Sequence, residues 1–84
     1  MHILSAGNSP ADKQIAVDGR WFTNLGPVYD GHHAKICDWY LFFHDGYWYI
    51  GQVAEIGDHG HQVRFIGDLR WMPVSGMAAL QTPR

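Results

Sequence analysis

With 84 residues, the chain has room for one small domain and not for two. A hydrophobic fraction of 46% and a charged fraction of 17% exclude an intrinsically disordered chain, because there is enough apolar surface to bury. The formal net charge is -2 and Lys and Arg together number 6, so the chain lacks the basic surface expected of a nucleic-acid-binding protein.

The single cysteine, Cys37, excludes an internal disulfide and a zinc site built on two or more cysteines. The longest apolar run is about five residues, against the ~20 that cross a bilayer, so we expect no membrane contact. Ile3 and Leu4 make too short an apolar stretch for an export signal, which together with the free thiol predicts a cytoplasmic protein. No glycine-rich loop precedes a helical pattern, and we expect no cofactor.

The first part of the chain predicts an arm, a hairpin and a connector. Residues 1–12 contain a Gly-Asn-Ser-Pro run and are expected to form a flexible arm. Asp18 and Gly19 favour positive φ, which predicts a two-residue type I′ turn inside a hairpin over 14–24. Residues 24–33 are rich in turn formers and are expected to connect this hairpin to the next strand.

Short strands divided by turn residues follow. The predicted strands are 35–43, 47–56, 61–66 and 69–72, divided by Asp45-Gly46, Asp58-His59-Gly60 and Gly67-Asp68. Pro73 is expected to end the last of them, and 74–80 to form a single 3₁₀ or α-helical turn. The pattern predicts an all-β fold: a small SH3-like barrel of about five strands over 35–80, with residues 13–34 as an extra N-terminal hairpin and connector of the same domain, 13–84.

Alternation along the run 35–43 assigns its residues to two faces. Cys37, Trp39 and Leu41 share one apolar face, so we expect the thiol of Cys37 to be buried and inert. Tyr40 and Phe42 point to the opposite face.

The aromatic residues are the strongest candidates for a binding surface. Because alternation does not bury both faces of a strand, Tyr40, Phe42 and Tyr49 are predicted to form an exposed patch for a peptide or protein partner. One alternative is a second small core under the N-terminal hairpin, with Trp21 and Phe22 over these rings. Another is a homo-oligomer interface, since exposed apolar patches often mark subunit contacts.

Two segments resemble the Tudor family of SH3-like barrels. Residues 41–53 read Leu-Phe-Phe-His-Asp-Gly-Tyr-Trp-Tyr-Ile-Gly-Gln-Val, with the acidic turn before a Trp-Tyr pair that is typical of the first Tudor hairpin. Residues 62–77 continue with a Val-x-Phe strand, a glycine-containing turn and a short helical turn. The resemblance implies an aromatic cage that holds methylated lysine or arginine by cation–π attraction.

The Tudor resemblance places the cage on particular residues. Three cage positions fall on Phe42, Tyr49 and Phe65. Asp68 stands where the family has a fourth aromatic residue, and Arg70 where it has a polar one. Asp68 would attract a cationic ligand and Arg70 would repel it unless Asp68 neutralises the guanidinium. Trp71 would supply the missing wall if the turn were rebuilt.

A second resemblance implies an enzyme. Residues 50–53 and 69–74 are similar to strands of the plasmid-borne type B dihydrofolate reductases, tetramers whose central pore binds folate and NADPH. The pore strand of that family reads Val-Gln-Ile-Tyr-Pro-Val, and this chain has Arg70 at the Gln position and Met72 at the Tyr position. Because both functional side chains differ, we favour a barrel relative without the activity.

Metal binding and catalysis are weakly indicated. His59 and His61 are two residues apart beside Asp58, but no third ligand is set by spacing, so we favour solvated loop histidines. The sequence therefore predicts a non-catalytic module that binds a peptide or protein partner, a second copy of itself included. A type B reductase relative is the second hypothesis and a nucleic-acid adaptor the third.

Overall fold

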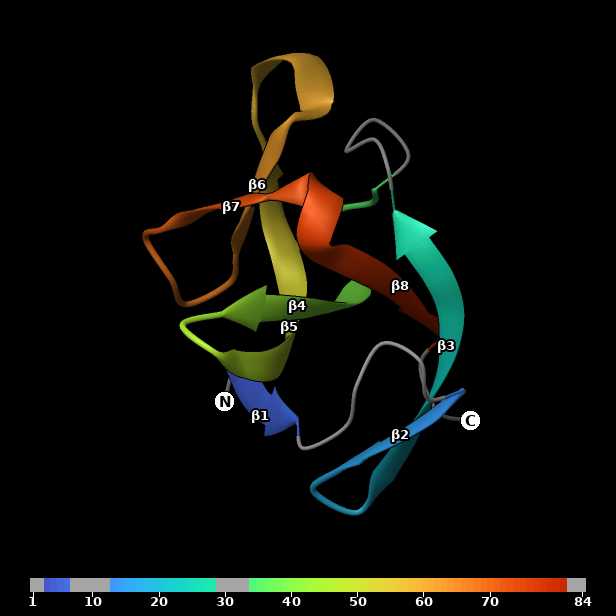
Figure 1. The fold of residues 1–84 in the computed structure, drawn as a ribbon. Coiled ribbons are helices and arrows are strands. Elements are labelled where there is room, and N and C mark those ends of the chain that lie inside the picture. The colour runs from blue at the N-terminus through green and yellow to red at the C-terminus, as the bar shows by residue number, and fades with distance from the viewer. Residues whose placement is uncertain (1–2, 7–12, 29–33, 82–84) are drawn as a thin grey trace.

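The computed structural model describes residues 3–6, 13–28 and 34–81, and these ranges fold entirely into strands, turns and two single-turn 3₁₀ helices (Figure 1). In chain order, the strands are β1 (Ile3–Ala6), β2 (Gln14–Val17), β3 (Arg20–Val28), β4 (Trp39–His44), β5 (Tyr47–Ile56), β6 (Gln62–Phe65), β7 (Trp71–Pro73) and β8 (Met77–Gln81). The 3₁₀ turns are η2 (Asp58–Gly60) and η3 (Val74–Gly76). The all-β prediction is confirmed. In these ranges no helix has the length and apolar character to cross a membrane.

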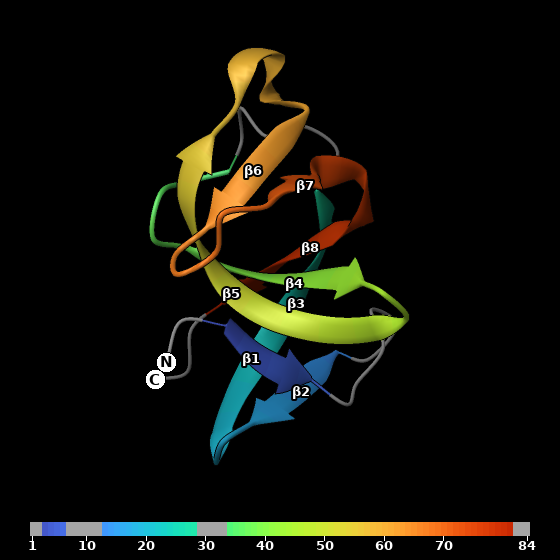
Figure 2. The same cartoon turned by 90° about the vertical axis from the view of Figure 1, so that its left-hand side faces the viewer.

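All strand pairs are antiparallel, in the order β2-β3-β8-β4-β5-β6-β7, with β1 added to β5. The long strand β5 organises the sheet because it serves three neighbours. Its residues 48–51 pair with β1, and its residues 53–56 pair with β6, while β4 pairs with 47–52. Figure 2 shows the strong curvature of β5 that lets the sheet fold over itself.

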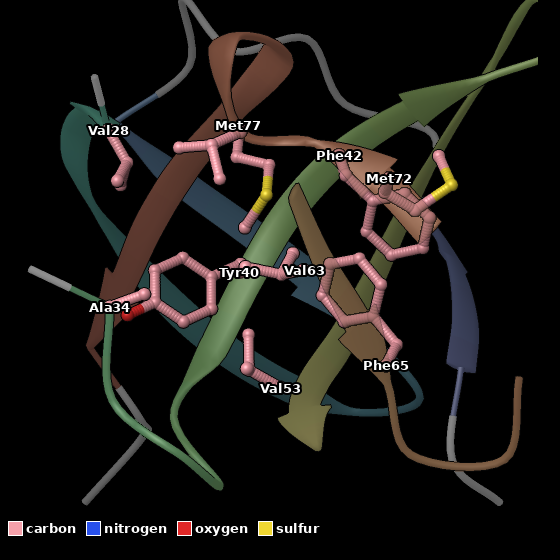
Figure 3. Packing of buried hydrophobic residues seen from close by; sticks show 10 residues of the cluster. Val28, Ala34, Tyr40, Phe42, Val53, Val63, Phe65, Met72 and Met77 are labelled. Carbon is pink, nitrogen blue, oxygen red and sulfur yellow. The ribbon is translucent and has the colours of Figure 1, made fainter. Parts of the chain in front are cut away.

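The middle residues of strands β4, β5 and β8 are buried on both faces, which divides the core into two clusters. The Phe42 cluster (Figure 3) consists of Val28, Ala34, Tyr40, Phe42, Val53, Val63, Phe65, Met72, Val74 and Met77. The Leu41 cluster consists of Leu4, Ala6, Ile15, Val17, Phe22, Leu41, Ile50, Ala78 and Leu80. The alternation of β4 assigns Tyr40 and Phe42 to one cluster and Leu41 to the other, so this strand separates the two clusters.

Both predicted Asp-Gly turns are confirmed. Asp18 and Gly19 have φ of 50° and 75°, and Asp45 and Gly46 have φ of 49° and 84°. Positive φ at both central positions is the type I′ signature, whose twist suits the flanking strands. These turns set the registers in which Val17 pairs with Arg20 and His44 with Tyr47.

The prediction of a flexible N-terminal arm is wrong for the residues that the structure describes. Residues 3–6 form β1, and Leu4 and Ala6 are buried in the Leu41 cluster. The free edge of β5 supplies the backbone partners, and the apolar Leu4 supplies the side-chain burial. Residues 1–2 and 7–12 of the expected arm lie outside the described ranges.

The expected helical segment 74–80 is correct only for its first turn. η3 covers residues 74–76, and Met77 begins β8, which pairs with β3 on one side and β4 on the other. Residues 24–28, expected in a connector, extend β3 instead, with a register shift between Asn24 and Gly26, which has φ of 104°. The rest of that connector, 29–33, lies outside the described ranges.

The expectation that Cys37 is buried is wrong. Cys37 is exposed and has φ of 70°, because the chain turns at residues 36–37 and β4 begins only at Trp39. The backbone N–H of Cys37 donates to the Val53 carbonyl at 2.7 Å, and the side-chain amide Nε2 of Gln52 donates to the Cys37 carbonyl at 2.9 Å. These bonds hold the turn, and the strand alternation that would have placed the thiol inward does not reach it.

Candidate functional site

The three predicted cage rings come together, but they pack against one another. The Phe42 and Phe65 rings stack at 4.1 Å between centroids and 15° between planes (Figure 3). Tyr49 stacks on Phe42 at 5.7 Å and 29°. Phe42 and Phe65 are 2% and 0% exposed. A cation–π site needs an open ring face, whereas the stacked faces of Phe42 and Phe65 cover each other.

The predicted exposed patch is therefore wrong for Tyr40 and Phe42, which belong to the core. The Tyr40 hydroxyl accepts a hydrogen bond from the Lys35 backbone N–H at 3.1 Å. Burial is the main cause that raises the pKa of Tyr40, so this hydroxyl stays neutral. A second core under the N-terminal hairpin does exist, but Phe22 packs there on Trp39, at 5.4 Å, and not on the rings of the predicted patch.

Asp68 and Arg70 form a tight pair in the β6–β7 loop. The Asp68 carboxylate accepts hydrogen bonds from the Arg70 backbone N–H at 2.9 Å and from its Nε at 2.9 and 3.0 Å, and Nη2 completes the ion pair. The hydrogen bond from the Arg70 side chain is the main cause that lowers the pKa of Asp68 to about 2. The guanidinium is thus neutralised by Asp68, the condition under which it would not repel a cation.

Arg70 also joins the loop to the β4–β5 hairpin. Its Nη1 donates a hydrogen bond to Nε2 of His44, the last residue of β4, and this Nε2 lies 3.2 Å from Oδ2 of Asp45. The loop and the hairpin turn both lie at the left-hand side of Figure 1. Asp68 is the main cause that raises the pKa of Arg70, and the charges of Asp45 and Tyr49 act in the same direction.

These contacts define a surface of mixed chemistry, which we call the Arg70 surface. Its members are His44, Asp45, Tyr49, Asp68 and Arg70, together with Tyr47, the cross-strand partner of His44, and Leu69, which lies between Asp68 and Arg70 in the chain. Leu69 is 88% exposed and Tyr47 is 66% exposed, whereas Tyr49 is half-buried against Phe42. The surface combines two apolar or aromatic side chains open to solvent with an arginine held in place on two sides.

Sequence reasoning identified only part of this surface. Tyr49 and Asp68 were predicted site residues, and both belong to it. His44, Asp45, Tyr47 and Leu69 were missed. The register of the Asp45-Gly46 turn could have revealed that His44 and Tyr47 pair, whereas no local signal placed them near Arg70.

Trp71 lies away from the stacked rings. It pairs with Arg64 across β6 and β7, is 42% exposed, and lies so close to Gly57 that a Cβ there would be 3.3 Å from its ring. Its neighbour Met72, at the Tyr position of the reductase pattern, is buried in the Phe42 cluster. Trp71 therefore does not supply the missing cage wall, and Met72 is not available to a ligand.

The two turn histidines form a loose pair. The ring centroids of His59 and His61 are 6.2 Å apart. Within the described ranges, no group of three His, Cys, Asp or Glu side chains is placed to hold a metal ion.

Comparison of the chain with protein-family models, with curated proteins and with solved structures finds no match. The geometry of the Arg70 surface is therefore the feature from which a function is inferred.

Proposed function

We propose that the chain is a non-catalytic interaction module on an SH3-like barrel, and that it binds a peptide or protein partner through the Arg70 surface. The observation that carries this proposal is the exposure of Tyr47 and Leu69 beside an arginine fixed by Asp68 and His44. The barrel assignment is supported by the short antiparallel strands, the curved β5 and the 3₁₀ turn before the last strand.

The residue types suit protein recognition. Tyrosine and arginine are enriched among the few residues that dominate the free energy of protein–protein binding. Asp68 and His44 already hold Arg70 in one geometry, so less side-chain entropy is lost when a partner docks on it. Covering Leu69 adds about 1.5–3 kcal/mol of hydrophobic free energy before those losses.

A selection experiment tests the proposal. The full chain is immobilised and used to select from a phage-displayed random peptide library, and the affinity of enriched peptides is measured by calorimetry. We expect Tyr47→Ala and Leu69→Ala each to weaken binding about tenfold or more, which corresponds to a loss of about 1.4 kcal/mol or more of binding free energy.

Trp21→Ala is the matched control, because Trp21 is a similarly exposed aromatic residue, at 60%, on the β2–β3 hairpin. Its affinity for the same peptides should stay within about twofold of the unmodified chain. Peptides that bind all four proteins equally, or a library that yields no binder, would contradict the proposal.

A further inference from the structure

Nε2 of His44 faces two groups of opposite charge. Nη1 of Arg70 donates a hydrogen bond to it from the β6–β7 loop, and Oδ2 of Asp45 lies 3.2 Å away in the β4–β5 turn. We propose that this arrangement is a pH-sensitive latch. Protonation of His44 breaks the hydrogen bond from Arg70 to Nε2, and Nε2 then donates a hydrogen bond to Asp45. This change releases the β6–β7 loop from the β4–β5 hairpin.

The hydrogen bond fixes the protonation state of the closed latch. A guanidinium nitrogen has only donor hydrogens, so Nε2 must be the acceptor. His44 is then neutral and carries its proton on Nδ1. Once Nε2 gains a proton it has no lone pair to offer Arg70, and the two positive charges repel. The same new N–H points toward a carboxylate that is ready to accept it.

His44 is the histidine of this cluster, and histidine is the side-chain type that serves as a charge switch near neutral pH. The neighbours on the loop are Arg70, which stays charged, and Asp68, whose pKa of about 2 keeps it ionised. Those on β5 are Tyr47, the cross-strand partner of His44, and Tyr49. In the turn itself lies Asp45, whose Oδ2 is the carboxylate oxygen next to Nε2 of His44.

The loop keeps its own structure when the latch opens. The bonds between Asp68 and Arg70 involve no group that titrates in this range, and Nη1 of Arg64 donates to the Asp68 carbonyl at 3.1 Å. The loop therefore separates from the hairpin as a unit anchored to β6. The release itself is a property of the free protein, whereas any change in partner affinity that follows from it rests on the proposed function.

NMR titration of the isotopically labelled full chain from pH ~8 to ~5 tests the latch across the histidine range. We expect the amide shifts of Asp68, Leu69 and Arg70 to follow the same midpoint as the His44 ring protons. The heteronuclear NOE of Leu69 and Arg70 should fall on the acidic side, which reports the loosened loop. Amide shifts without a fall in the heteronuclear NOE would overturn the latch, and so would loop amides whose titration midpoint differs from that of the His44 ring protons.

Two variants separate the latch from general effects of pH. In His44→Gln, the amide oxygen accepts from Arg70 at every pH, so the titration of the loop amides should be lost. His61→Gln removes an exposed histidine of the segment after η2 and should leave the loop titration unchanged. The reverse result, with the titration kept in His44→Gln or lost in His61→Gln, would overturn the latch. If the latch is overturned, the proposed binding function still stands or falls by the peptide selection, because that experiment does not depend on release of the loop.

Discussion

Gly51 is the residue at which the two stacked rings and β1 leave no space for a side chain. A Cβ at this position would lie 3.0 Å from Phe65, 3.3 Å from Phe42 and 3.4 Å from Ile3. Because both rings are buried, neither moves aside without disturbing the Phe42 cluster. We expect Gly51→Ala to lower the free energy of unfolding by about 1–3 kcal/mol, measured by urea denaturation.

Gly76 supplies the control for this substitution. A Cβ at Gly76 meets nothing within 4 Å, and its φ is not in the left-handed region. Gly76→Ala should therefore be neutral or stabilise the fold by a few tenths of a kcal/mol, because alanine restricts the unfolded chain. Equal losses at Gly51 and Gly76 would show that the close packing on Gly51 has no energetic weight.

Asp68 gives the molecule an acid-dependent part of its stability. Its folded pKa of about 2 lies below the ordinary 3.8, so the folded state favours the carboxylate. This contribution is fully present above about pH 4 and is lost as the pH falls through about 2. Asp68→Asn should therefore lower the free energy of unfolding by about 1–2 kcal/mol at neutral pH. Urea melts of both proteins from pH ~7 to ~2 should converge at the acidic end, and a constant difference would contradict this origin.

At the scale of elements, β1 is the strand whose contribution is most easily isolated. Leu4 is buried in the Leu41 cluster, and Ser5, its neighbour on the strand, is exposed. Leu4→Ala should lower the free energy of unfolding by about 2–4 kcal/mol, from lost burial and the cavity left behind. Ser5→Ala should change it by less than about 0.5 kcal/mol. If Leu4→Ala had no effect on the urea midpoint, residues 3–6 would behave as the arm that the sequence predicted.

Elements closed by local turns could be predicted from the sequence, and elements that depend on distant partners could not. Asp18-Gly19 and Asp45-Gly46 each contain the conformational preference that closes their own hairpin. Residues 77–80 read Met-Ala-Ala-Leu, which suits a helix, and they form a strand because β3 and β4 pair with both of their edges. Tertiary pairing of this kind overrides local propensity and leaves no mark in the segment itself.

The candidate site follows the same division. Asp68 and Arg70 are two residues apart, and their mutual neutralisation was foreseen as the condition for binding a cation. The contact of Arg70 with His44 spans 26 residues and depends on how the loop lies against the hairpin. The prediction of an open cage is wrong because alternation assigns the residues of a strand to two faces but does not say which face is buried. In β4 both faces are inside, since the Leu41 cluster covers the second one.

At the scale of the whole molecule, the two clusters should unfold together. They share β4, β5 and β8, whose alternate residues enter opposite clusters, so the loss of one cluster removes the support of the other. The radius of gyration of 11.5 Å fits a single compact body of this length, for which about 12 Å is expected.

Phe22→Leu in the Leu41 cluster and Phe65→Leu in the Phe42 cluster should each shift one common unfolding transition. Methyl NMR signals of Ile15 and Leu80 report one cluster, and those of Val53 and Val63 report the other. In a urea titration of each variant, both sets should disappear at the same midpoint. A variant in which only the signals of its own cluster disappear early would show that the shared strands do not couple the two halves of the core.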